Sequence, residues 1–206
     1  MPPQVTRVQT LPTPNTRGDE RRRRILTALH DCIINKGYSK TTLADVAQAA
    51  DMTPSHLLYY FRGKDAILEQ YFDNVADRIL ERIDEFSHQA PERQIELLGE
   101  LFFAGNGINH SEIGFMLECF GVAVHDETLH REKANLVRQL KVYLKTLFKT
   151  ASPEFTNRAE DSAELAYAML MGLLTAAYFD DRLGLPQARR LFGSSMLNLA
   201  NPVSRS

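Results

Sequence analysis

The stretch that decides the fold runs from residue 23 to residue 72 and reads RRILTALHDCIINKGYSKTTLADVAQAADMTPSHLLYYFRGKDAILEQYF. A long helical pattern, with Leu29 and Ile33 on one face, ends at Gly37, a residue type that tolerates the positive φ common after helix ends. Two short helical patterns follow, and a second long one starts at Lys64. A pair of short helices between two longer supports predicts a helix-turn-helix unit.

The two short helices carry start signals. Thr42 can cap the first of them, with Asp45 three residues later in a capping-box arrangement. Thr53 can cap the second, with Pro54 at the first helical position, where the missing backbone N–H costs no hydrogen bond. Gly63 ends this second helix. The signals therefore predict where both short helices begin.

The outward face of the second short helix is rich in aromatic and hydroxyl groups. Leu57 and Phe61 point inward, which leaves on the outside Ser55, His56, Tyr59 and Tyr60. Such groups on an exposed helix can contact thymine methyl groups, base edges and phosphate oxygens of duplex DNA. On these features alone, a helical hairpin that packs against another domain stays open as the alternative.

Charge is distributed unevenly along the chain. The 206 residues carry a formal net charge of −2, yet residues 17–68 hold nine Lys and Arg against six Asp and Glu. The acidic excess therefore falls in residues 69–206. A basic front on an acidic body is expected if only the front meets DNA phosphates. A solvated helix start at residues 21–24 explains the charges equally well.

Residues 23–72 resemble the DNA-binding domain of the tetracycline-repressor (TetR) family. The matching positions are Ile25, Leu26, Ala28, Gly37, Tyr38, Thr41, Thr42, Val46, Ala47, Ala50, Thr53, Leu57, Tyr60, Phe61, Lys64, Ile67 and Leu68. The chain departs from the usual family pattern at three positions, where it has Asp51 and Ser55 in place of the common Gly and Leu58 in place of a frequent Tyr.

The resemblance implies roles for residues of the DNA surface. Thr42 would contact a phosphate, and Tyr60 and Lys64 would hold the DNA backbone. The base-reading surface would consist of Thr53, Pro54, Ser55, His56 and Tyr59. The implied partner is double-stranded DNA, with a homodimer presenting two such helices to a palindromic site.

The rest of the sequence is helical throughout, which predicts an all-α fold of about nine helices. We expect a disordered tail at residues 1–17, a helix-turn-helix DNA-binding domain at residues 18–66, and a helical-bundle effector-binding and dimerisation domain at residues 67–206. The expected later helices cover residues 64–87, 126–150 and 155–183, and others start at Pro91, after a capping Ser111, and at Pro186.

The last two helices predict a dimer. The helix expected at residues 155–183 is apolar on nearly all sides, so one side needs a partner beyond its own domain. In the family that the chain resembles, the last two helices pair with those of a second subunit as a four-helix bundle. The expected interface residues are Leu165, Met169, Gly172, Ala176, Phe179, Leu191, Phe192 and Ser195.

The middle helices are rich in aromatic and soft side chains. The group comprises Phe102, Phe103, Phe115, Met116, Cys119, Phe120 and Tyr143. Ordinary core packing is the alternative for any one of them, but glycines at positions 105, 107, 114 and 121 suggest space between the helices. By analogy with the family, we expect a cavity for a small, largely hydrophobic effector here.

Other function classes find little support. The two cysteines and six histidines show no metal-ligand spacing, so no metal and no cofactor are expected. The absence of hydrolase, P-loop and dinucleotide motifs argues against an enzyme. Residues 1–17 lack the apolar core of a signal peptide, and the apolar run at 165–179 is short for a membrane span. We therefore expect a cytoplasmic protein without a membrane partner.

Taken together, the patterns and the resemblance to the TetR family imply a ligand-responsive transcriptional repressor. It would bind a palindromic operator as a homodimer and be released by a small hydrophobic effector. A helix-turn-helix regulator that activates, or that responds to no small molecule, is the alternative. A small helical enzyme is the least favoured interpretation.

Overall fold

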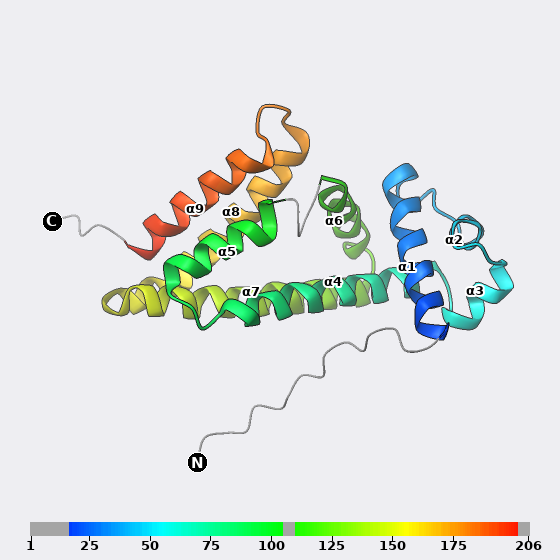
Figure 1. The fold of residues 1–206 in the computed structure, drawn as a ribbon, viewed down its shortest axis with the longest axis horizontal. Coiled ribbons are helices and arrows are strands. Elements are labelled where there is room, and N and C mark those ends of the chain that lie inside the picture. Colours follow the sequence, from blue (N-terminus) through cyan, green and yellow to red (C-terminus); the bar gives the residue numbers. More distant parts are fainter. Residues whose placement is uncertain (1–16, 105–109, 202–206) are drawn as a thin grey trace, which may run out of the picture.

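The computed structural model describes residues 17–104 and 110–201, and all regular structure in these ranges is helical (Figure 1). Nine α-helices and one short 3-10 helix, with no strand, make up this described part of the chain. The predicted all-α fold is confirmed. Residues 1–16 of the predicted tail lie outside the described residues, and Arg17 already belongs to the first helix.

The N-terminal unit consists of α1 (Arg17–Lys36), α2 (Leu43–Ala49) and α3 (Pro54–Tyr60), followed by the first turns of α4 (Lys64–Phe86). Their apolar faces meet in one buried cluster, which includes Ile25, Leu29, Ile33, Val46, Leu57, Ile67 and Leu68. Helices of only two turns are unstable in water by themselves, so this cluster is what holds α2 and α3 in place.

Both predicted helix caps of the N-terminal unit are confirmed. Thr42 Oγ1 accepts a hydrogen bond from the backbone N–H of Asp45 (3.2 Å), and the backbone N–H of Thr42 donates to the Asp45 carboxylate (2.7 Å). Thr53 Oγ1 accepts from the backbone N–H of His56 (3.2 Å), and Pro54 stands at the start of α3. These bonds satisfy N–H groups that helix starts otherwise leave unpaired.

The turn between α2 and α3 contains a residue in the left-handed region. Asp51 has a φ of 57°, which costs a residue with a Cβ more than it costs glycine. This is a position where the resembled family usually has Gly, and Asp tolerates the conformation better than most residues. The turn is closed by a hydrogen bond from the Met52 N–H to the Ala47 carbonyl (3.0 Å).

The C-terminal unit is a bundle of longer helices. It contains most of α4 together with α5 (Pro91–Phe103), α6 (His110–Ala123), α7 (Glu127–Ala151), the 3-10 helix η1 (Pro153–Arg158), α8 (Ala159–Phe179) and α9 (Leu185–Ala200). One buried cluster joins the C-terminal half of α4 to α5, α7, α8 and α9. Figure 1 shows α4 and α7 side by side along one edge of the bundle, with α5, α8 and α9 stacked against them.

The predicted helix at residues 155–183 is wrong at both ends. Phe155 has non-helical backbone angles, so a 3-10 helix precedes α8. At the other end α8 stops at Phe179, because Asp180 adopts an extended conformation and turns the chain. The Asp180 carboxylate accepts a hydrogen bond from the Arg182 N–H (2.9 Å), a local bond that competes with helix continuation.

Helix α6 also differs from the sequence predictions. Ser111 lies inside α6, so it is not the helix cap. Gly114 leaves no space, since the Tyr178 hydroxyl oxygen would lie 2.7 Å from a Cβ at this position. Gly121 is exposed, and a Cβ there would meet nothing within 4 Å. The glycines at 105 and 107 lie outside the described residues.

Helix α6 joins the two units. Its Phe115 and Cys119 side chains belong to the buried cluster of the N-terminal unit, while Ile113 belongs to the cluster of the bundle. The Glu118 carboxylate accepts a hydrogen bond from the backbone N–H of Tyr38 (3.1 Å), just beyond the end of α1. Figure 1 shows α6 standing between α1 and the bundle. The predicted boundary near residue 66 is therefore crossed by shared packing.

Candidate DNA-binding surface and ligand cavity

Helix α3 presents the side chains that the sequence analysis assigned to base reading. Tyr59 is 81% exposed, while Leu57 on the opposite side is fully buried and Phe61 nearly so. Exposed beside Tyr59 are Thr53, Pro54, Ser55, His56 and Leu58. Burial of the inner side chains anchors α3, and the outer ones are exposed to solvent, which is the geometry that a helix entering a major groove needs.

Two arginines at the start of α1 brace α3, although the sequence indicated only their charge. Arg21 Nη1 donates to the Tyr60 hydroxyl (3.2 Å) and lies 3.4 Å from His56 Nε2. Arg22 Nη1 donates to the Tyr60 carbonyl (3.1 Å), and its guanidinium lies over the Phe61 ring. The basic run at residues 21–24 was the available signal for these contacts. The run therefore orients α3 and brings positive charge to its side.

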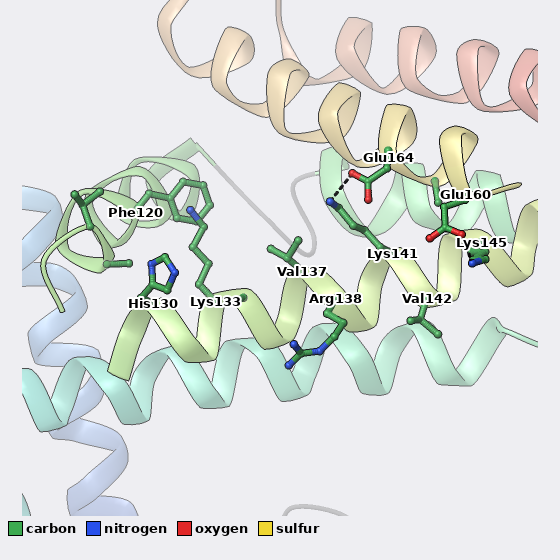
Figure 2. A pocket seen from close by; sticks show the side chains of 14 residues that line it. Phe120, His130, Lys133, Val137, Arg138, Lys141, Val142, Lys145, Glu160 and Glu164 are labelled. Carbon is green, nitrogen blue, oxygen red and sulfur yellow. Dashed lines mark hydrogen bonds and ion pairs between the residues drawn. The ribbon is translucent and has the colours of Figure 1, made fainter. Parts of the chain in front are cut away.

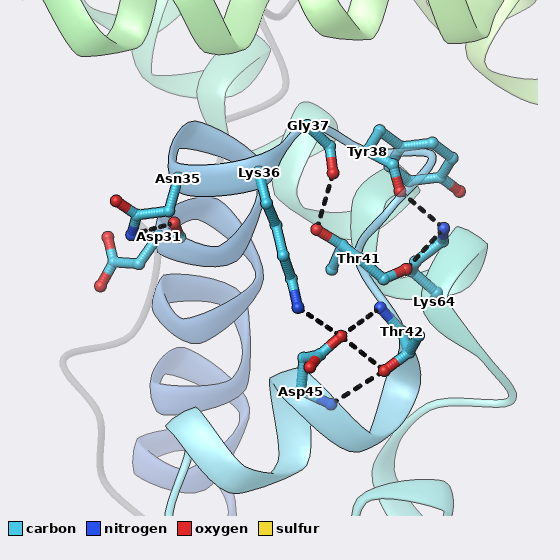
Figure 3. A network of polar contacts seen from close by, with 9 residues as sticks. All are labelled: Asp31, Asn35, Lys36, Gly37, Tyr38, Thr41, Thr42, Asp45 and Lys64. Carbon is cyan, nitrogen blue, oxygen red and sulfur yellow. Dashed lines mark hydrogen bonds and ion pairs between the residues drawn. The ribbon is translucent and has the colours of Figure 1, made fainter.

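Lys64, predicted to hold the DNA backbone, is tied to its own chain (Figure 3). Its ammonium donates to the carbonyl oxygens of Tyr38 (2.9 Å) and Thr41 (2.9 Å) and lies 3.9 Å from the centroid of the Tyr38 ring. The Tyr38 hydroxyl in turn donates to Asp65. Two of the three N–H donors of Lys64 are thus used to fix the start of α4 against the loop before α2.

The hydroxyl of Thr42, predicted to meet a phosphate, is also engaged within the chain. Thr42 Oγ1 donates to the Asp45 carboxylate (2.5 Å), which forms an ion pair with Lys36 (2.6 Å), as Figure 3 shows. The bond with Lys36, followed by those with Thr42, holds the pKa of Asp45 well below its usual range. Thr42 is exposed, so a phosphate that reaches its hydroxyl has to replace the bond to Asp45.

A cavity of about 700 Å³ lies in the bundle among α4, α5, α6, α7 and α8. Five of the seven side chains predicted for a ligand pocket line it, namely Phe102, Phe115, Met116, Cys119 and Phe120. Burial raises the pKa of the Cys119 thiol to about 12, so this cysteine is an apolar wall group rather than a nucleophile. The size is typical of sites for small organic molecules.

The other two predicted pocket residues lie elsewhere. Phe103 packs on Phe192, with ring centroids 5.4 Å apart, in the core between α5 and α9. The Tyr143 hydroxyl donates to Gln94 Oε1 (2.8 Å), and burial raises the pKa of Tyr143. Neither side chain lines the cavity, since Tyr143 contacts the first turn of α5 and Phe103, the last residue of α5, packs against α9.

The cavity wall carries more charge than the aromatic sequence pattern indicated. The charged lining residues are Arg78, Arg82, Glu100, Glu112, Lys133 and Arg189. Arg189 forms an ion pair with Glu100 (3.0 Å), and Arg82 with Glu85 (2.6 Å), which does not line the cavity. These charged residues lie on the same helices as the apolar stripes but beside those stripes. The aromatic pattern alone therefore did not predict them.

A second hollow, of about 690 Å³, runs along the outside of α7 (Figure 2). Lys133 and Phe120 line both this groove and the cavity. Farther along the groove, Lys141 pairs with Glu164 (2.5 Å) and Lys145 with Glu160. Figure 2 shows the Lys133 side chain extending from α7 to the Phe120 ring.

The outer faces of α8 and α9 expose large apolar side chains. Leu165 is 59% exposed, Phe179 72% and Leu191 44%, and Gly172 is exposed among them. Three further residues predicted for the interface are partly exposed, namely Met169, Ala176 and Ser195. Phe192 is 1% exposed and packs in the core of its own chain, so assigning it to the interface was wrong.

One helical stretch in the described residues, Pro153–Phe179, is long and apolar enough to cross a membrane by length and composition. Its α8 part packs on α7 and α9 through Ala163, Ala166 and Leu170. The remaining apolar side chains are those on the exposed face described above. A core helix of a bundle passes the same test of length and composition.

Family comparisons cover both units of the chain. Residues 25–71 match the family model of bacterial regulatory proteins of the tetR family, and residues 91–198 match that of the C-terminal part of BetI-type transcriptional repressors. The HTH-type transcriptional regulator BetI of Escherichia coli O45:K1 is 24% identical over 176 residues, which cover 83% of this chain and 89% of BetI.

Solved structures share the fold. A TetR transcription regulator from Haloarcula marismortui aligns with a TM-score of 0.74 and 20% identity, over 88% of this chain and 96% of its own. A protein from Saccharomonospora viridis, solved in complex with choline, aligns with a TM-score of 0.77 and 18% identity, over 86% and 96% of the two chains. Because the C-terminal model spans more than half of the sequence and the tetR model spans the helix-turn-helix, this protein belongs to the TetR family of transcriptional regulators.

Proposed function

We propose that the protein is a ligand-responsive repressor that binds a palindromic operator as a homodimer and leaves it when a small effector fills the cavity. The observation that carries the DNA-binding part is the division of α3 into a buried side, Leu57 and Phe61, and an exposed side led by Tyr59. Repression rather than activation is favoured by the match of residues 91–198 to the BetI-type repressor model.

Several exposed groups on or beside α3 suit contact with duplex DNA. His56 and Tyr59 offer donors, acceptors and ring edges to bases, and Ser55 offers a hydroxyl. Thr42 and Lys64 lie at the starts of α2 and α4, and the start of α4 has no side-chain cap, so its N–H groups also favour phosphate. In our proposal these two residues hold the backbone in addition to their bonds within the chain.

A two-fold dimer is supported by the apolar faces of α8 and α9. Leu165, Phe179 and Leu191 together leave a large apolar surface in water if the chain stands alone. Contiguous apolar patches of this kind mark contact surfaces. A two-fold axis through this face sets the distance between the two α3 helices, which suits two half-sites of one operator.

The release mechanism follows from the double role of α6 and α4. Phe115 on α6 and Tyr71 on α4 both line the cavity and pack on each other, with ring centroids 4.6 Å apart. His30 on α1 contacts both rings, at 5.5 Å from Tyr71 and 5.0 Å from Phe115. A ligand that moves either ring therefore acts directly on α1, which braces α3. Such coupling requires different ligand affinities in the two poses, typically worth about 1–3 kcal/mol.

The working place of such a regulator is the cytoplasm, where it meets the chromosome. Its effector is a small molecule that the cavity can enclose. The related protein from Saccharomonospora viridis was solved with choline, which supports the idea that this bundle type holds small organic ligands. The proposed role is regulatory, and no catalytic step is assigned to the cavity.

Selection of bound duplexes from a random DNA pool tests the proposal. We expect enrichment of a palindromic sequence, bound by two subunits, with an affinity that falls steeply as salt concentration rises. A variant with Tyr59→Ala and His56→Ala, which leaves the buried side of α3 unchanged, serves as the matched control and should lose the enrichment. Failure of the wild-type protein to enrich any duplex at low ionic strength would contradict the proposal.

A further inference from the structure

The cavity wall has more cationic than anionic side chains, and only some of the cations form ion pairs. Four are cations and two are carboxylates, and the Glu100 carboxylate is already paired with Arg189 (3.0 Å). Arg82 has Glu85 at 2.6 Å. Among the residues that the structure describes, Lys133 has no carboxylate within 4.0 Å. The cavity wall therefore has a surplus of positive charge.

Lys133 occupies a specific place in this wall. Its ammonium lies 3.5 Å from the centroid of the Phe120 ring, where α7 faces α6 (Figure 2). Partial burial lowers the pKa of Lys133, and desolvation is the only cause of the shift. A partly desolvated cation without a counter-charge is unfavourable, and an anion placed beside it removes that cost.

Much of the remaining cavity wall is apolar. Side chains from five helices supply this surface, among them Phe72, Ile79, Phe102, Met116, Leu140 and Leu174. These groups have no hydrogen bonds to offer, so they favour the hydrocarbon part of a ligand. A molecule that matches both features has an apolar body and one anionic end.

We propose that the cavity binds a small amphipathic carboxylate, with its carboxylate held by Lys133 and its hydrocarbon body among the apolar walls of α4, α5 and α8. This inference rests on the proposed function, since it specifies the effector of the same cavity. It separates this chain from a receptor for a quaternary ammonium ion such as choline. The ring face of Phe120 that could hold such a cation is covered by the chain's own ammonium, which also repels it.

Three probes of equal chain length separate the possibilities: decanoate, decan-1-ol and decyltrimethylammonium. Isothermal titration calorimetry with the full chain and no DNA measures their binding, at concentrations below those that form micelles. We expect decanoate to bind at least roughly tenfold more tightly than the alcohol, because only the carboxylate pairs with Lys133. Decyltrimethylammonium should bind most weakly. Absence of decanoate binding, or a cation that binds as tightly as decanoate, would overturn the inference.

Variants of Lys133 test the assigned contact. Lys133→Met keeps the apolar stem on Phe120 and should weaken decanoate binding roughly ten- to hundredfold while leaving decan-1-ol unchanged. Lys133→Arg should retain most of the preference for the anion. Lys149→Met, which removes the same charge from an exposed position on α7 outside the cavity wall, is the matched control and should bind decanoate like the wild type.

The readout separates this inference from the proposed function. Decanoate binding that depends on Lys133, in a protein that binds no duplex DNA, would leave the ligand assignment standing and remove the regulator assignment. A protein that selects an operator but binds decanoate equally well with Lys133→Met would do the reverse.

Discussion

At the scale of single residues, Tyr59 is the clearest candidate for contact with bases, because its side chain is 81% exposed on a helix whose other side is buried. Tyr59→Ala should weaken specific operator binding by about 1–3 kcal/mol, since a side chain at a base edge contributes on this scale. Fluorescence anisotropy with a labelled operator measures the change. Tyr59→Phe separates the hydroxyl from the ring, and an unaltered affinity in both variants would remove Tyr59 from the reading surface.

Lys64 offers a second residue-scale prediction, which concerns the stability of the protein measured without DNA. Lys64→Met removes the ammonium that bonds the carbonyl oxygens of Tyr38 and Thr41. The free energy of unfolding in urea should fall by about 1–3 kcal/mol, since two carbonyl groups lose a charged donor.

The control for this prediction is Lys40→Met, which removes a charge from an exposed lysine in the same loop. It should leave the urea midpoint unchanged. A Lys64→Met protein as stable as the wild type would mean that Lys64 serves DNA alone, as the family resemblance by itself implies.

Single residues also show where sequence reasoning stops. Phe102 and Phe103 are neighbours on α5, yet Phe102 lines the cavity and Phe103 packs on Phe192. Successive residues on a helix point about 100° apart, so which aromatic faces a cavity depends on the rotation of α5 against its neighbours. That rotation results from the packing of the whole bundle, and the same uncertainty misplaced Phe192 in the interface.

At the scale of helices, local chemistry predicted the starts of α2 and α3 because each is decided within three or four residues. Thr42 with Asp45, and Thr53 with Pro54, satisfy helix ends without help from distant parts of the chain. The 3-10 helix before α8 was not predicted, and the α-helix was expected from residue 155 although the backbone of Phe155 is non-helical. Periodicity reports which face is apolar, and it is insensitive to a change from α to 3-10 winding.

Alanine substitutions at two glycines of α6 should change the stability of the protein in opposite directions. Gly114→Ala should destabilise the protein by about 1–3 kcal/mol, because a Cβ there lies 2.7 Å from the Tyr178 hydroxyl and forces α6 and α8 apart. Gly121→Ala, with nothing within 4 Å, should stabilise the same helix by about 0.5–1 kcal/mol. Thermal unfolding followed by circular dichroism gives both values.

A double variant shows whether the contact with Tyr178 is the cause. Combined with Tyr178→Ala, the Gly114→Ala change should lose most of its cost, because the obstructing ring is gone. Equal effects of Gly114→Ala with and without Tyr178 would contradict this explanation.

At the scale of the whole molecule, the exposed apolar face of α8 and α9 predicts the oligomeric state. Sedimentation equilibrium should give about twice the chain mass of 23.3 kDa for the wild type. Phe179→Glu together with Leu191→Glu should shift the mass towards that of one chain, since two charges would be buried without partners in the interface.

The control for the dimer prediction is Leu58→Glu, which adds a charge at an exposed leucine of the α3 surface. This variant should remain dimeric and lose DNA binding. A wild-type protein that sediments as one chain at micromolar concentration would contradict the two-fold arrangement.

Because α6 packs against both the N-terminal unit and the bundle, it limits how hybrid regulators can be built. The side chains of Phe115 and Cys119 complete the hydrophobic interior of the N-terminal unit, although they lie more than fifty residues beyond the end of α3 in the sequence. A hybrid in which only residues 17–72 come from another regulator would pack foreign α1 and α4 surfaces against the original α6, whose side chains do not match them. Such hybrids should therefore include α6 of the donor regulator. An N-terminal unit expressed without α6 should expose to solvent the apolar surface beside His30 that Phe115 covers.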